Sequence, residues 1–193
     1  MPVKPSAWSY AWLKLSAMAL LVFGRRAAAL AVFDRMLARF PDDAYALASR
    51  AHLRAEQGDT ALAAADAQRL VDAHPTRRRA ADWFNLGFLR DRLGEHAAAE
   101  AAFRQALGLD PRLDRAWYGL ALTLIQQGRL EDAVAALKKN TELQPLSPFG
   151  WYQLARVHAN RQEPEKARRI IAHLKNFEPK VAAQLERETG LAA

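Results

Sequence analysis

The sequence predicts an all-α fold, an α-α superhelix in which similar helical hairpins stack one after another. The chain repeats with a period of 34 residues, as the spacing of Trp83, Trp117 and Trp151 shows. Within each period, apolar residues recur at the i, i+3 and i+4 spacing of one helix face, and a glycine-marked turn separates two such stretches. A fixed period of about 20 to 50 residues is typical of stacked-repeat proteins, because one hairpin buries too little apolar surface alone.

The recurring positions divide the chain into repeats that end at prolines, with a closing helix after the last one. Proline lacks the N–H that a helix interior needs, so it fixes where the next repeat starts. A two-residue insertion within TRRRAAD shifts the frame once. We expect one domain over residues 1–193, with a closing helix at 180–190 and repeats at 10–43, 44–77, 80–113, 114–147 and 148–181.

The first helix of the first repeat, expected at residues 7–23, is apolar nearly all round, with Lys14 as its only charge. A terminal repeat normally has a polar outer face. A signal peptide is disfavoured because Arg25 and Arg26 follow the apolar run and no small-residue cleavage site precedes them. A transmembrane helix is disfavoured because 17 residues with a central lysine fall at the lower limit of a span. We expect self-association through residues 7–23, with a partner, residues 1–6 or a membrane as the alternatives.

The third repeat carries a family resemblance. From Trp83 it reads WFNLGFLR, then AEAAF and a final proline, and so resembles the tetratricopeptide repeat (TPR) family, whose pattern is W-x2-L-G-x2-Y, A-x3-F and P. The resemblance extends over about residues 10–181. It implies a superhelix of helix-turn-helix repeats that acts as a non-enzymatic adaptor or scaffold. The second repeat departs most from the pattern, since Arg50, Arg54 and Ala67 stand where the family has larger apolar groups, which puts the packing of that repeat in doubt.

The resemblance also implies where a partner binds, namely on the concave surface that the first helix of each repeat lines. Aromatic rings offer large apolar contact at low conformational cost, amides hydrogen-bond a peptide backbone, and arginine holds a carboxylate through two parallel bonds. An alternative for the rings, above all Phe84 and Phe149, is packing between neighbouring first helices. We expect a groove for a peptide segment, lined by Tyr45, His52, Phe84, Asn85, Phe88, Arg92, Arg115, Tyr118, Phe149, Tyr152, Gln153, Arg156 and Asn160.

One specialised form of this groove is not predicted. Some members of the family hold a partner's C-terminal carboxylate in a two-carboxylate clamp of Lys, Asn and Arg from three consecutive repeats. Counted from the second repeat, the matching positions here are Ala48, His52, Asn85, Arg115 and Gly119. Asn85 fits and Arg115 fits loosely, so a generic C-terminal tail is not the expected ligand.

The sequence offers no catalytic, cofactor or metal site. It has no cysteine, no glycine-rich phosphate loop and no nucleophile motif, and its five histidines are scattered without metal-ligand spacing. We therefore expect a protein that is not an enzyme and uses no cofactor.

Net charge raises nucleic acid as a second class of partner. The chain carries +7, but the repeats with the richest expected groove are not basic, and Arg77–Arg79 form a single basic run on the inserted loop. A solvated loop is the simpler interpretation of that run, with an acidic partner or a phosphate as the alternative. The sequence thus favours a protein-binding scaffold over a nucleic-acid-binding protein, and we expect it in a bacterial cytoplasm.

Overall fold

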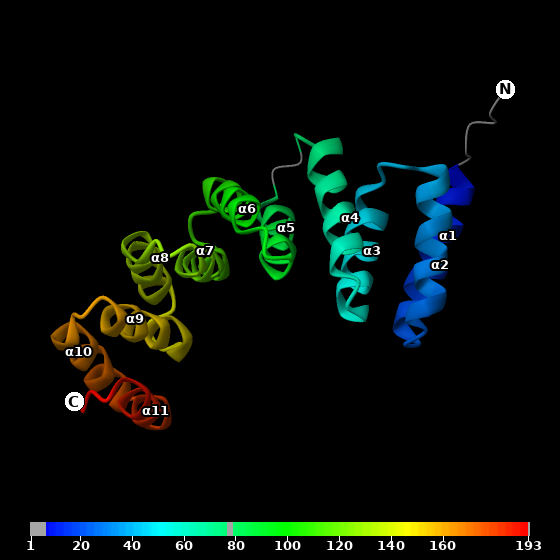
Figure 1. Cartoon of the computed structure of the whole chain (residues 1–193). Helices are drawn as coiled ribbons and strands as arrows, with labels where there is room; N and C mark the ends of the chain where they lie inside the picture. The colour runs from blue at the N-terminus through cyan, green and yellow to red at the C-terminus, as the bar shows by residue number, and fades with distance from the viewer. Residues whose placement is uncertain (1–6, 77–78, 193) are drawn as a thin grey trace. The chain divides into compact units, whose positions relative to one another are not determined.

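The computed structural model describes residues 7–76 and 79–192, and these form helices joined by short turns. No strand occurs in those residues, so the predicted all-α class is confirmed. Figure 1 shows the helices in chain order. They are α1 (Ala7–Val22), α2 (Arg26–Arg39), α3 (Ala44–Gln57), α4 (Thr60–Ala73), α5 (Ala80–Arg92), α6 (His96–Leu109), α7 (Asp114–Gln126), α8 (Leu130–Leu143), α9 (Pro148–Asn160), α10 (Pro164–Lys175) and α11 (Pro179–Thr189).

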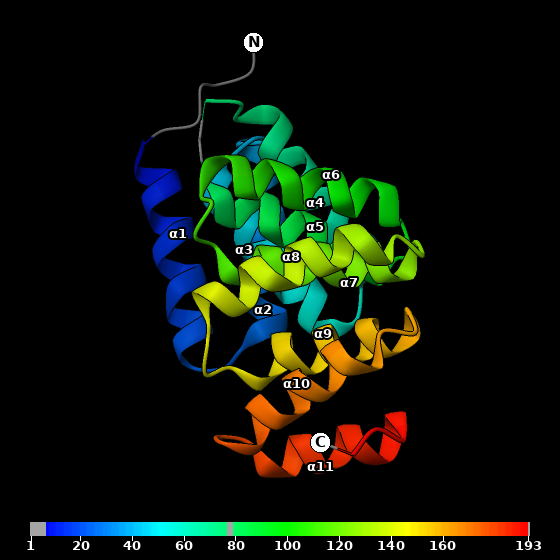
Figure 2. The same cartoon turned by 90° about the vertical axis from the view of Figure 1, so that its left-hand side faces the viewer.

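The helices form two compact units, Met1–Leu93 and Gly94–Ala193. In the first unit, α1 to α5 pack in succession, each against the next. In the second unit, α6 to α11 do the same, and α11 lies against both α10 and α9 (Figure 2). The expected closing helix at 180–190 is α11. The single domain over residues 1–193 stays a prediction.

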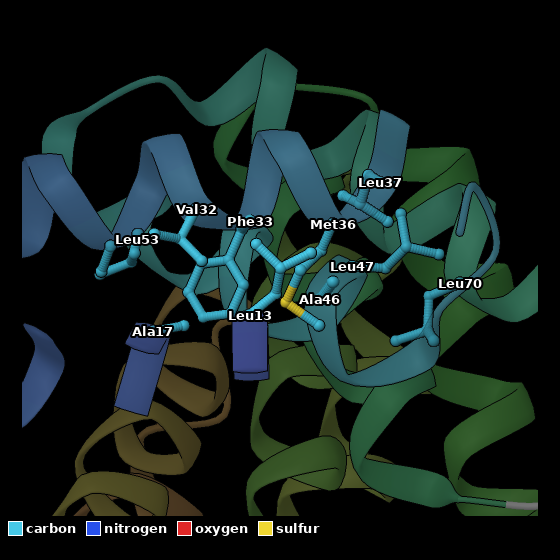
Figure 3. Packing of buried hydrophobic residues seen from close by; sticks show 11 residues of the cluster. Leu13, Ala17, Val32, Phe33, Met36, Leu37, Ala46, Leu47, Leu53 and Leu70 are labelled. Atoms are coloured by element: carbon cyan, nitrogen blue, oxygen red, sulfur yellow. The ribbon is translucent and has the colours of Figure 1, made fainter. Parts of the chain in front are cut away.

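The core of the first unit joins its first four helices (Figure 3). Phe33 and Met36 of α2 are fully buried at its centre, and Phe33 meets the ring of Tyr45 edge-on, with centroids 5.8 Å apart. Burying one such side chain contributes about 1.5–3 kcal/mol. The other residues of the cluster drawn and labelled in the figure are Leu13, Ala17, Val32, Leu37, Ala46, Leu47, Leu53 and Leu70.

The turn inside each hairpin needs a left-handed residue. Gly58 ends α3 with a φ of 91°, and its N–H donates to the carbonyl of Ala55. Gly128 takes the same role after α7, with a φ of 75°. In the last hairpin this position, 34 residues further on, is Gln162, with a φ of 58°. A residue with a β-carbon is strained there, so this turn is held by its surroundings.

In the second unit, the recurring tryptophans and prolines bond to each other. The indole N–H of Trp117 donates to the carbonyl of Pro111 at 2.9 Å, and that of Trp151 to the carbonyl of Pro145 at 2.8 Å. Each bond joins the end of one repeat to the first helix of the next. The two partners are six residues apart in both cases, so the bond closes the same turn at both repeat junctions.

Close approach of helices in the second unit depends on two glycines. A β-carbon on Gly119 of α7 would lie 2.6 Å from Cζ of Phe103 in α6. A β-carbon on Gly150 of α9 would lie even closer to Oδ1 of Asn140, whose amide donates to the carbonyl of Asp114 at 2.9 Å. Glycine is required at both positions because the neighbouring groups occupy the space of a side chain.

The unusual second repeat is held by ion pairs. Arg50 of α3 donates to both carboxylate oxygens of Asp66 of α4, through Nε at 2.8 Å and Nη2 at 2.6 Å. Arg54 Nη1 donates to the same carboxylate at 2.8 Å. Asp34 of α2 accepts from Arg50 Nη1 at 2.8 Å. Both arginines that depart from the family pattern are thus paired with carboxylates. In the second repeat these ion pairs take the place of the apolar contacts that the family pattern has there.

Candidate partner-binding site

The first unit contains a hollow of about 250 Å³ bounded by α3, α4 and α5. It lies entirely within that unit and is mainly apolar. Its lining residues are Ala48, Ala51, His52, Ala55, Ala67, Leu70, Asp82, Phe84, Asn85, Phe88 and Leu89.

The hollow exists because its floor is made of small side chains. Ala48, Ala51 and Ala55 stand at i, i+3 and i+7 of α3, which places them on one helix face. Ala67 of α4 adds a fourth methyl group. An alanine side chain ends at its β-carbon, so four of them leave space that leucine or phenylalanine would fill.

Aromatic rings of α5 form one wall. Phe84 and Phe88 stack one helical turn apart, with centroids separated by 6.5 Å and planes at 23°. Phe88 is 48% exposed, and the guanidinium of Arg92 lies 5.9 Å from its ring centroid. Stacking on a cation and on a neighbouring ring keeps this exposed ring in place without burying it.

Polar groups stand at the rim. Asn85 is exposed on α5, and His52 is exposed on α3 with its Nε2 3.5 Å from Glu56. Four of the residues expected in the groove, His52, Phe84, Asn85 and Phe88, therefore line the same hollow, and Arg92 touches it through Phe88. An apolar pocket with a few polar groups at its edge is the usual form of a ligand site.

Asp82 lines the hollow and was not expected from the sequence. Its carboxylate is buried, in the first turn of α5. An acidic residue in the first turn stabilises a helix through the helix dipole, so the sequence around Asp82 indicates the start of a helix and gives no sign of a site. The alanines of the floor were missed for a similar reason, because a small residue gives no chemical signal.

Tyr45 lies away from the hollow. Its ring packs on Phe33, and the ammonium of Lys14 stands 4.8 Å from its centroid. The ring of Tyr45 thus packs on α2, the second helix of the preceding repeat. Its role in binding a partner stays a prediction.

In the second unit, most of the expected residues lie along two further depressions. Arg115, Tyr118 and Phe149 border one of about 280 Å³, with Asn140 and Gln144 beside them. Phe149 is 68% exposed, which fits a groove position. Gln153 is half-buried on α9 and is not one of the residues that line either depression.

The other depression, of about 510 Å³, is polar and includes Tyr152, Arg156 and Asn160. Here the closing helix supplies a carboxylate: Tyr152 Oη donates to Oε2 of Glu188 at 2.7 Å, and Arg156 Nε lies 4.0 Å from the same oxygen. The bond to Glu188 raises the pKa of Tyr152, and bonds from Gln184 and Tyr152 lower the pKa of Glu188. Arg156, which the sequence predicts to hold a partner's carboxylate, and the predicted groove residue Tyr152 thus already face an internal carboxylate.

Other classes of site were also considered for residues 7–76 and 79–192. No group of three acidic or histidine side chains in these ranges is placed to hold a metal ion. No helix in the described ranges combines the length and hydropathy of a bilayer span. Arg77 and Arg78 of the basic run lie outside the described residues, and Arg79, the last of the run, is exposed before α5.

Comparison with known proteins decides the family. The pattern of the tetratricopeptide repeat matches residues 15–78 and 84–148, and a second pattern of the same description matches residues 148–173. The chain belongs to the tetratricopeptide repeat family. The resemblance drawn from the repeated residues is confirmed, and with it a fold that serves as a protein-protein interaction scaffold. TPR proteins are in general non-enzymatic adaptors.

Solved structures of TPR proteins share the fold. The chain superimposes on YrrB with a TM-score of 0.79 at 18% identity, over 89% of this chain and 88% of YrrB. On MamA the TM-score is 0.81 at 16% identity, over 96% of each chain. At these identities the likeness concerns the fold, and the predicted α-α superhelix of TPR repeats is confirmed.

A curated relative is much longer. Cellulose synthase operon protein C of Pseudomonas fluorescens (strain SBW25) is 29% identical over 148 residues, which cover 74% of this TPR chain. The same alignment covers 12% of the relative. The chain therefore corresponds to a small part of that protein.

Proposed function

We propose that this TPR protein is a non-enzymatic scaffold that binds a peptide segment of a partner, with one apolar side chain seated in the hollow between α3, α4 and α5. The observation that carries the proposal is a hollow lined both by four alanines and by the stacked Phe84 and Phe88. Such a pocket fits a leucine, isoleucine, methionine or phenylalanine side chain, because its wall and floor are apolar and its volume is about 250 Å³.

The rim supports a peptide rather than a free apolar molecule. Asn85 can donate to and accept from a peptide backbone beside the pocket, His52 also lines the pocket, and Arg92 lies against the ring of Phe88. In other binding sites, an anchor residue in a pocket with polar groups around it carries most of the affinity. The solved TPR protein YrrB is described as having an unusual peptide-binding site, which agrees with this use of the fold.

The test uses peptides displayed on phage, selected against the purified full chain. We expect the selected peptides to share one large apolar residue. Ala55→Leu fills the floor of the hollow with a good helix former, so it should weaken the selected peptides at least tenfold while leaving the helix content unchanged. Ala61→Leu makes the same change at an exposed position of α4 and serves as the control.

The two variants separate the outcomes. Loss of binding in Ala55→Leu, with normal binding in Ala61→Leu, would support the hollow as the anchor site. Equal binding of the peptides to wild type and to Ala55→Leu would refute it. The cytoplasmic location expected from the sequence stays a prediction.

A further inference from the structure

The outer face of α1 is a continuous apolar stripe. The exposed fractions are 87% for Trp8, 69% for Trp12, 63% for Leu15, 82% for Val22 and 78% for Phe23 just after the helix. At 100° per residue these side chains lie on one face of the helix. Soluble monomers rarely expose a contiguous apolar patch larger than a few hundred Å². We call these five residues the Trp8–Phe23 face.

The opposite side of α1 is held by the core. Leu13 and Ala17 are buried in the cluster of Figure 3, and the ring of Tyr10 meets that of Phe40 edge-on at 5.3 Å. Lys14, the charge of this helix, lies against Tyr45. The helix therefore cannot roll its tryptophans inward without breaking the core, and the Trp8–Phe23 face is a surface of the folded unit.

The stretch of sequence that carries this face has charges of one sign only. Residues 1–33 contain no aspartate or glutamate, whereas they contain Lys4, Lys14, Arg25 and Arg26. The two arginines are exposed directly after the apolar stripe, at the turn into α2. Arg26 also lies 3.4 Å from Glu56. Of the two arginines, Arg25 is therefore the better placed to meet an anionic headgroup.

We propose that the Trp8–Phe23 face lies on the surface of a lipid bilayer that contains anionic lipids, with α1 parallel to the membrane plane. Tryptophan is favoured at the level of the headgroups, where its ring is half apolar and half polar, and phenylalanine, leucine and valine enter the acyl boundary. Arginines beside the stripe would meet anionic headgroups. Because one side of α1 is packed on protein, the contact is with a surface and not with lipid on all sides.

A second copy of the chain fits the face less well. In a two-fold contact the same residues meet each other, so the arginines and apolar groups would face a copy of themselves. Residues 1–33 contribute no carboxylate to pair with them, and the nearby Glu56 already lies 3.4 Å from Arg26. Charge complementarity therefore favours an anionic lipid surface over the self-association expected from the sequence. This membrane contact goes beyond the proposed peptide binding, because none of its five residues lines the hollow.

The experiment is co-sedimentation of the full chain with two kinds of vesicle, phosphatidylcholine alone and an equimolar mixture with phosphatidylglycerol. We expect binding to the mixed vesicles that falls as salt is raised. Trp8→Ser with Trp12→Ser should reduce the partition coefficient at least tenfold. The control is Leu62→Ser with Leu146→Ser, which removes two exposed leucines elsewhere, 52% and 75% exposed, and should bind as wild type.

A charge variant tests the second part of the proposal. Arg25→Glu should bring binding to the mixed vesicles close to that of phosphatidylcholine alone. Circular dichroism checks that each variant remains folded, which we expect because the changed side chains are exposed. The proposal is overturned if wild type does not sediment with the mixed vesicles, or if the double tryptophan variant binds as well as the leucine control.

Light scattering without lipid provides the alternative outcome. A dimer of wild type that becomes a monomer in the double tryptophan variant, together with no vesicle binding, would assign the face to a second copy and overturn the membrane contact. Peptide binding by the hollow is measured without vesicles, so failure of either proposal leaves the other intact.

Discussion

The ion pairs of the second repeat allow a prediction with a worked magnitude. Asp66 is 5% exposed at its side chain and accepts from both Arg50 and Arg54. The two arginine side chains are 15% and 17% exposed, so Asp66→Ala leaves two largely buried guanidinium groups with less charge to balance them. Removing one partner of a buried pair costs about 3–5 kcal/mol.

Two features reduce that figure. Asp34 remains 2.8 Å from Arg50 and 3.8 Å from Arg54, and it is half exposed, so part of the pairing survives. Both arginine side chains are also partly exposed to water. We therefore expect Asp66→Ala to lower the free energy of unfolding by about 2–4 kcal/mol, measured by urea denaturation followed by circular dichroism.

A triple variant and a control make the argument refutable. Arg50→Leu with Arg54→Leu and Asp66→Ala restores the apolar residues that the family pattern has, and should lie within about 1 kcal/mol of wild type because no charge is left buried. Asp72→Ala, which removes an exposed acceptor of Gln68 on the same helix, should cost less than about 0.5 kcal/mol. The reasoning fails if the triple variant is as unstable as Asp66→Ala alone.

Three further predictions concern the second unit. Gly119→Leu should lower the melting temperature, costing about 1–3 kcal/mol, because its side chain would collide with the buried Phe103; an unchanged melting temperature would contradict this. Gln162→Gly should stabilise the last hairpin by up to about 1 kcal/mol in urea denaturation, because glycine adopts a φ of 58° without strain. The hydrogen bond with His158 lowers the pKa of Glu163, so this carboxylate stabilises the fold above its ordinary pKa, and the contribution is lost as pH falls through the lowered value. Glu163→Gln should flatten that acid-side loss in urea midpoints taken from neutral to acid pH, and an identical slope would refute it.

The helices were predictable because their signals are local and recur. The segment expected at 7–23 is α1 at Ala7–Val22, and the closing helix expected at 180–190 is α11 at Pro179–Thr189. Glycine turns, closing prolines and apolar spacing each act within a few residues, and their repetition through the chain removes the ambiguity of any single copy. The packing of the second repeat could not be predicted from such local signals, because its ion pairs join residues 12 and 16 positions apart on different helices.

The site was predictable only in part. Phe84, Asn85 and Phe88 were expected in the groove from their register, since register fixes which face of a helix a side chain occupies. The hollow itself depends on space left by Ala51 and Ala55, and an alanine gives the same signal whether it faces a partner or a neighbouring helix. The bond from Tyr152 to Glu188 spans 36 positions, and no local pattern indicates it.

The two proposed surfaces recognise their ligands by different properties. The hollow of α3 to α5 is defined by shape, so its ligand is selected by the size of one apolar side chain and by backbone bonds near Asn85. The Trp8–Phe23 face is an exposed apolar stripe with arginines at its end, so its ligand must offer an apolar layer beside negative charge. A bilayer with anionic lipids offers both, whereas a folded partner would need carboxylates at matching positions. Because the two surfaces share no residue, a scaffold lying on a membrane through α1 would keep its hollow free for a peptide. Peptide affinity should then be the same with and without vesicles, and a loss of affinity on vesicles would show that the bilayer covers the hollow.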